Sequence, residues 1–246
     1  SATPELLFDI KAHPIFTGHP LDRNRLPGDI RSALGPIAPE QKSIYPNQLP
    51  MELRLELIHR FNIFLTPLKE AKRIGCVMVQ LPPWTTATRG AARALERLPE
   101  LLPDTPIAVE FRHHSWLDPQ RQDRVRDLLR ANNMAYVCVD EPNVKGGGVP
   151  PLVFSTRDDL GVMRFHGQNA AGWHPGASVL ERFNYLYSSA ALREWLLPIR
   201  KLSAQTSRVH VVFNNCVRDY AVLNAKGLAA LLVDDESNLA VSTDPC

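Results

Sequence analysis

The stretch PIAVEFRHHSWLD, residues 106–118, begins as an apolar strand and ends in charged and aromatic side chains. Glu110 and Arg112 are two residues apart, so a strand places both on one face. Charged groups at the end of a buried strand are costly unless they are paired or used. A polar end that recurs on several strands would indicate a shared site, whereas one such end indicates a local ion pair.

Strand-like runs alternate along the chain with longer amphipathic segments. The runs are rich in β-branched and aromatic residues and cover 6–12, 76–81, 107–112, 135–140, 161–167 and 209–215. Helices are predicted at 51–73, at 88–102, from Asp118-Pro119 onward, at 179–202 with a kink at Pro198, and at about 219–232. This alternation predicts parallel βαβ units. The stretch 141–160, with KGGGVPP, lacks the spacing of a dinucleotide-binding turn and is predicted as a surface loop.

Every predicted strand finishes with a polar residue at its C-terminal end. In a parallel (β/α)8 barrel these ends converge on one mouth, where active sites are built. The pattern therefore predicts a pocket at that mouth. The alternative is that the charges only pair inside the structure, Glu110 with Arg112 or with Arg164. The residues concerned are Lys11, Gln80, Glu110, Arg112, Asp140, Arg164, His166, Asn214 and Asn215.

Composition limits the class of protein. The 246 residues are 44% hydrophobic, which suits one large domain or two small ones. A net charge of +2 gives no strong field toward nucleic acid or a membrane. The four cysteines show no CxxC spacing and suit a reducing compartment. We find no apolar run of transmembrane length and no signal peptide, and we expect a cytoplasmic protein.

Five segments in order resemble the signature blocks of the DUF72 family, also called YecE-like proteins. Four of them are VQLPPW (79–84), AVEFRHHSW (108–116), MRFHGQ (163–168) and VFNNCVRDYAVLNA (212–225). The fifth, FDIKAHPIFTGH (8–19), resembles the family's Lys-Ala strand followed by a Thr-His pair, although Gly18 here separates Thr17 from His19. Together the blocks span nearly the whole chain.

The resemblance implies one TIM-type (β/α)8 barrel domain over residues 1–246. Its strands would correspond to the third to eighth strands of the family, so we expect the chain to lack the family's first two. The family's activity is unknown. Its barrel resembles those of endonuclease IV and xylose isomerase-type enzymes, which is an analogy of fold alone.

The first hypothesis is an enzyme, of the hydrolase class, that acts on an anionic or phosphorylated small molecule. Lys11, Arg112 and Arg164 would hold the anion, because a guanidinium matches phosphate and carboxylate geometry. Glu110 and His166 would exchange protons with the substrate. The remaining predicted substrate-binding residues are Gln80, Trp116, Asp140, Asn214 and Asn215.

Two other hypotheses remain open. A metal-dependent phosphodiesterase like endonuclease IV could take ligands from Glu110, Asp140, His166 and His113 or His114, although no HxH or HExxH motif is present. No cofactor is otherwise implied. A non-catalytic nucleic-acid or ligand-binding barrel could use Trp84, Trp116 and Trp173 as a stacking rim or only as hydrophobic lids. The loop 166–176 follows a strand end and could cover a substrate or be an inert excursion.

Overall fold

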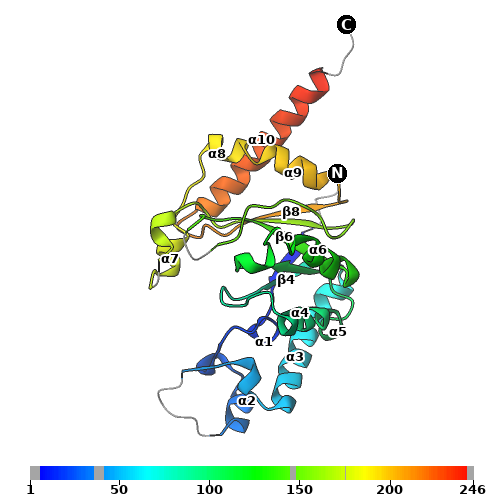
Figure 1. The fold of residues 1–246 in the computed structure, drawn as a ribbon, viewed down its shortest axis with the longest axis vertical. Helices are drawn as coiled ribbons and strands as arrows, with labels where there is room; N and C mark the ends of the chain where they lie inside the picture. The colour runs from blue at the N-terminus through cyan, green and yellow to red at the C-terminus, as the bar shows by residue number, and fades with distance from the viewer. Residues whose placement is uncertain (1–5, 36–41, 145–147, 175, 243–246) are drawn as a thin grey trace. The chain divides into compact units, whose positions relative to one another are not determined.

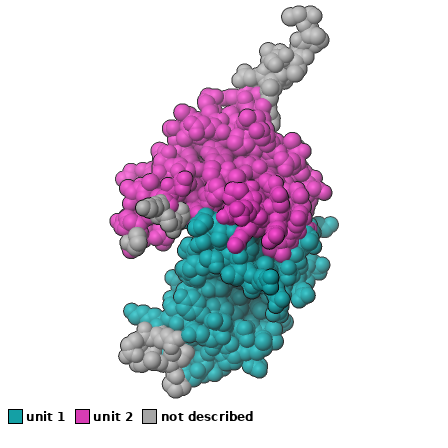
Figure 2. All heavy atoms as spheres, viewed as in Figure 1, with its two compact units in different colours: residues 1–116, 131–134 teal, residues 117–130, 135–246 magenta. Residues whose placement is uncertain are grey.

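The structure is a computed structural model that describes residues 6–35, 42–144, 148–174 and 176–242. The chain divides into two compact units, which Figure 2 shows in different colours. Unit 1 contains residues 1–116 and 131–134, and unit 2 contains residues 117–130 and 135–246. Each unit is described by itself below.

Unit 1 contains three parallel strands in the order β1 (Phe8–Lys11), β4 (Ile74–Gln80) and β5 (Ile107–Glu110). Long helical segments connect them: α3 (Met51–Glu70) between β1 and β4, then α4 (Arg89–Glu96) and α5 (Leu98–Leu101) before β5. The single helix predicted at 88–102 is therefore broken at Arg97. Pro99 lies in the first turn of α5, where a missing N–H costs nothing.

A small subdomain of short elements lies between β1 and α3. It contains α1 (Pro14–Thr17), β2 (Leu21–Asp22), the 3₁₀ turn Arg23–Arg25, α2 (Gly28–Ala33), β3 (Ser43–Ile44) and the 3₁₀ turn Pro46–Gln48. Strands β2 and β3 are antiparallel. Its core is formed by Leu21, Leu26, Ile30, Ile44, Leu49 and Leu57. Elements this short show no hydrophobic period, so the sequence pattern predicted none of them.

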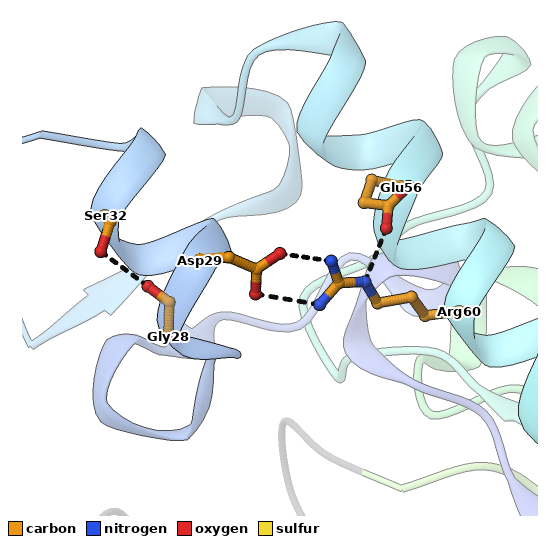
Figure 3. Close-up of polar contacts among 5 residues, drawn as sticks. All are labelled: Gly28, Asp29, Ser32, Glu56 and Arg60. Carbon is orange, nitrogen blue, oxygen red and sulfur yellow. Dashed lines mark hydrogen bonds and ion pairs between the residues drawn. The ribbon is translucent and has the colours of Figure 1, made fainter.

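Arg60 of α3 connects this subdomain to the long helix. Its guanidinium donates to both carboxylate oxygens of Asp29 on α2, with Nη1 3.0 Å from Oδ1, and its Nε donates to Glu56 at 2.7 Å (Figure 3). The hydrogen bonds from Arg60 hold the pKa of Asp29 below its usual range. A bidentate pair of this kind fixes the orientation of α2 on α3.

Replacing Arg60 by glutamine should raise the pKa of Asp29 toward the ordinary aspartate value of about 3.9. The folded pKa is depressed, so the pair stabilises the fold above the unfolded pKa, and that stability is lost as the pH falls through the folded pKa. An NMR titration of the Asp29 carboxyl carbon measures the change. Arg93→Gln, an exposed change on α4, is the matched control. An Asp29 pKa that is the same in both variants would contradict the pairing.

Unit 2 contains three parallel strands in the order β6 (Met134–Asp140), β7 (Gly161–Phe165) and β8 (Val209–Phe213). Helix α6 (Gln122–Ala131) precedes β6, and α10 (Tyr220–Ser242) follows β8 (Figure 1). Every residue of β6 and β7 is buried, as expected for parallel strands covered on both faces. The helix predicted from Asp118-Pro119 begins later, because Asp118 instead closes a turn by accepting from the backbone of Gln120 at 3.0 Å.

The prediction of one helix over 179–202 is wrong. Three short helices occupy the segment: α7 (Val179–Arg182), α8 (Ser189–Arg193) and α9 (Leu196–Ser203). Helix α8 starts anew at Ser188, whose hydroxyl accepts from the backbone of Ala191 at 3.2 Å. Pro198 lies in the first turn of α9, where helix N–H groups have no intrahelical partner, so it causes no kink.

The chain thus has an α/β fold with six parallel strands and helices between them. This confirms the predicted class in its coarser form. The loop predicted at 141–160 contains no helix among its described residues, and part of KGGGVPP (145–147) lies outside them. Among the described residues, no helix is both long and apolar enough to cross a membrane. One domain over 1–246 stays a prediction.

Candidate functional site

The strands of both units end in polar residues at the positions that the sequence pattern indicated. Lys11, Gln80, Glu110 and Asp140 are the last residues of β1, β4, β5 and β6. His166 and Asn214 directly follow β7 and β8. The polar residues of unit 1 and those of unit 2 make different hydrogen bonds, and each group is described in turn below.

Glu110 is the centre of a polar group in unit 1. Its side chain is fully buried, and Oε1 accepts from Gln80 Nε2 and from Arg112 Nη1, both at 3.1 Å. Gln80 and Glu110 are register partners on β4 and β5, which explains the amide contact. The ion pair that the sequence left as an alternative, Glu110 with Arg112, is therefore present. It orients the guanidinium just beyond the end of β5.

A pocket of about 470 Å³ lies at the end of β1. It is lined by Lys11, Ala12, His13, Pro14, Thr17, His19 and Phe61. The hydroxyl of Thr17 lies 2.8 Å from Nδ1 of His19. Burial lowers the pKa of His19, and the positive charges of Lys11 and Arg112 lower it further. Two cations and an imidazole are therefore close enough to influence one another in unit 1.

The predicted site residues did not include His13 and His19. His13 caps α1: its Nδ1 accepts from the backbone of Ile15 at 3.3 Å, and burial lowers its pKa. The available signal for His13 was its place directly before Pro14, since Pro is common at the first helical position. For His19 the signal was the Thr-His pair of the resemblance, which tolerates the inserted Gly18.

Unit 2 holds a chain of hydrogen bonds through Arg164, Asn214 and His166. Arg164 Nη2 donates to Asn214 Oδ1 at 2.8 Å, and Asn214 Nδ2 lies 3.1 Å from His166 Nδ1. A guanidinium can only donate, so it fixes the orientation of the amide, and the amide nitrogen must then donate to the imidazole. A neutral His166 accordingly carries its proton on Nε2.

Asp140 and Asn215 make their contacts elsewhere in unit 2. Asp140 accepts from the hydroxyl of Tyr187 and from Nε2 of Gln168, each at 2.5 Å. Asn215 is completely buried, and its amide donates to the carbonyl of Tyr185 at 2.8 Å and to Oδ1 of Asn224 at 2.7 Å. These bonds give Asn215 a structural task, since they hold the backbone before α8.

The aromatic and histidine residues after β5 also have defined places in unit 1. Trp116 is 2% exposed, stacks on Phe111 with ring centroids 4.7 Å apart, and donates from Nε1 to the carbonyl of Thr85 at 2.7 Å. This is the hydrophobic-lid arrangement. His113 and His114 stack with centroids 4.4 Å apart. Binding and metal-ligand roles for these residues stay predictions.

Replacing Glu110 by alanine should lower the free energy of unfolding by about 3–5 kcal/mol, because it leaves the Arg112 charge without its buried carboxylate. Glu110→Gln keeps the shape and should cost less. Urea unfolding followed by circular dichroism measures both. The double change Glu110→Ala with Arg112→Met should recover part of the loss. A Glu110→Ala protein as stable as the wild type would show that the ion pair carries no stability.

Comparisons with known proteins agree with this architecture. The family model described as "Protein of unknown function DUF72" matches residues 1–245. The chain is 29% identical to the UPF0759 protein YunF of Bacillus subtilis (strain 168) over 197 residues, which are 78% of this chain and 70% of that protein. Crystal structures of DUF72 family proteins from Enterococcus faecalis V583 and Thermotoga maritima MSB8 match with TM-scores of 0.69 and 0.65 and identities of 29% and 32%.

Each structural match covers 72% of this chain, and they cover 66% and 65% of the solved chains, just under two thirds of their length. Matches of this extent, in sequence and in structure, make the chain a member of the DUF72 family.

Proposed function

We propose that this DUF72 protein is an enzyme of the (β/α)8-barrel type that binds a small anionic or phosphorylated molecule. In barrels of this type, active sites are built at the C-terminal ends of the strands. We assign anion binding and catalysis to polar residues at the ends of β1, β5 and β7. Lys11 and Arg112 bind the anion, and Arg164 is a further cation at a strand end.

The surroundings of His19 carry the proposal. Lys11 and Arg112 both lower the pKa of this imidazole, so their charges act on the same small region of unit 1. Lys11 and His19 also line one pocket of about 470 Å³. Positive charges near one another repel, and an anion bound beside both would reduce that repulsion. A bound phosphate or carboxylate would supply that anion, and Arg112 is already oriented by Glu110.

Glu110 and His166 are the proposed acid–base groups. Glu110 is a buried carboxylate that a bound substrate could approach from the end of β5. His166 accepts a hydrogen bond at Nδ1 from Asn214, so its Nε2 N–H is left to donate a hydrogen bond to a substrate. Substitution tests each role separately. Gln at position 110 and Asn at position 166 keep hydrogen-bonding groups in place but remove the groups that gain and lose a proton.

Inorganic phosphate should raise the pKa of His19, because an anion beside the imidazole favours its charged form. An NMR titration of the histidine ring protons, with and without phosphate, measures this shift. Lys11→Gln, at an exposed position, should weaken phosphate binding by about threefold to tenfold. Lys226→Gln on α10, also exposed, is the matched control.

An unchanged His19 pKa at saturating phosphate would overturn the anion site, as would a Lys11→Gln protein that binds phosphate like the Lys226→Gln control. Circular dichroism of both variants separates loss of binding from loss of folding.

For a phosphorylated or carboxylated substrate that the protein converts, Glu110→Gln and His166→Asn should each lower kcat by about 10²-fold or more, the size typical of acid–base groups. Initial rates across a panel of sugar phosphates, phosphomonoesters and carboxylic esters measure this. Turnover that persists in both variants would overturn the acid–base roles of Glu110 and His166. It would not bear on the residues assigned to anion binding.

A further inference from the structure

Unit 2 contains a second pocket that the proposed function does not use. Its volume is about 520 Å³, and it opens beside the end of β6 and the helices α8 and α9. Its wall is made by side chains of two kinds. One kind is carboxylates and the neutral groups that donate hydrogen bonds to them, and the other is apolar and aromatic side chains. The lining residues are Asp140, Pro151, Val153, Gln168, Tyr185, Tyr187, Ala191, Glu194, Trp195 and Pro198.

Asp140 is the deepest charged group of this pocket. It is 5% exposed, and both of its carboxylate oxygens accept hydrogen bonds from neutral groups, the hydroxyl of Tyr187 and the amide of Gln168. Burial raises the pKa of Asp140, whereas those two hydrogen bonds lower it. A buried carboxylate is normally paired with a positive charge, and the side-chain hydrogen bonds of Asp140 to the described residues come from two neutral donors.

The rest of the described wall carries no positive charge. Among the described residues that line this pocket there is no lysine, arginine or histidine. A second carboxylate, Glu194, lies at its exposed rim, and its negative charge also raises the pKa of Asp140. Tyr185, Tyr187 and Trp195 add aromatic surface. Carboxylates beside aromatic rings are the surroundings that favour an organic cation, through charge and through cation–π attraction.

We propose that this pocket binds an organic cation, a protonated amine or a guanidinium attached to a small apolar or aromatic group. The charged end lies against Asp140 and Glu194, and the apolar part lies against Tyr185 and Trp195. The cation supplies the positive charge that the described lining residues do not provide. This site is separate in its residues from the anion-binding residues, so the two proposals stand or fall independently.

The pocket is also held in place by bonds that do not involve a ligand. The hydroxyl of Tyr187 accepts from the backbone of Gly167 at 2.9 Å, and Asn224 bonds to both the N–H and the carbonyl of Tyr187 at 3.1 and 2.9 Å. Gly167 has φ +92°, and a Cβ there would lie 2.7 Å from Cβ of Tyr185. Such preorganised walls lower the ordering cost of binding.

Three probes of similar shape and different charge test the proposal on the full chain: benzylamine, benzyl alcohol and benzoate, each titrated by calorimetry. Benzylamine should bind at least about tenfold more tightly than benzyl alcohol, and benzoate should not bind in this pocket. A titration with Nα-acetyl-lysine N-methylamide, whose side-chain ammonium is free, distinguishes the two sources of such a cation. Stronger binding of that compound than of benzylamine points to a lysine side chain of a partner protein, and the reverse points to a free aromatic amine.

Two charge-removing variants locate the binding. Asp140→Asn keeps an oxygen for Tyr187 to donate to and should weaken benzylamine by about tenfold. Glu194→Gln, at the exposed rim, should weaken it by about threefold. Glu96→Gln, exposed on α4, is the control and should bind as the wild type does. Circular dichroism confirms folding of each variant, and phosphate binding should be unchanged in all three.

Benzylamine that binds no better than benzyl alcohol would overturn the proposal. Equal benzylamine affinity in Asp140→Asn, Glu194→Gln and the control would overturn it as well, because the cation would then lie elsewhere. If Asp140→Asn does not fold, Glu194→Gln alone decides, since its side chain is exposed and its removal leaves no buried group without a partner.

Discussion

The hydrogen-bond register of the parallel strands is the constraint on which the rest of this structure depends. In a parallel pair, the register decides which side chains leave the two strands at the same level. Gln80 and Glu110 are register partners at the ends of β4 and β5, and so the amide reaches the carboxylate. In unit 2, the pairing of Phe165 with Phe213 brings the next residues, His166 and Asn214, to the same level. A shift of one residue would turn each polar end to the other face.

Both polar groups therefore follow from backbone pairing, yet they differ in chemistry. In unit 1 a carboxylate holds a guanidinium, which fixes the direction of a positive charge. In unit 2 a guanidinium holds an amide, which fixes the tautomer of His166. The first arrangement suits binding of an anion, and the second suits transfer of a proton. Neither requires a strained backbone, because none of these residues is among those with a positive φ.

The sequence predicted the six strands well, because buried parallel strands are short continuous apolar runs with polar ends. It predicted the helices less well where local caps interrupt a periodic pattern. The segment 179–202 looks amphipathic throughout, but Ser188 starts a new helix. The side chains of Asn215 and Asn224 bond to the backbone of residues 185–187, which lie outside any helix. The contact between Asp140 and Tyr187 joins residues 47 positions apart, and no local pattern encodes a contact of that span.

Burial by itself does not decide what a carboxylate does in this protein, because Glu110 and Asp140 are similarly buried at equivalent ends of their strands. The difference lies in the partner. Glu110 faces Arg112, whose permanent charge stabilises the carboxylate as an anion. Asp140 faces a tyrosine and a glutamine. Their neutral hydrogen-bond donors compensate the buried charge only in part, and burial raises the pKa of Asp140. A carboxylate of the first kind has its counter-charge built in, and it acts by orienting that charge. One of the second kind gains more from an external cation, because the described lining of its pocket includes no lysine, arginine or histidine.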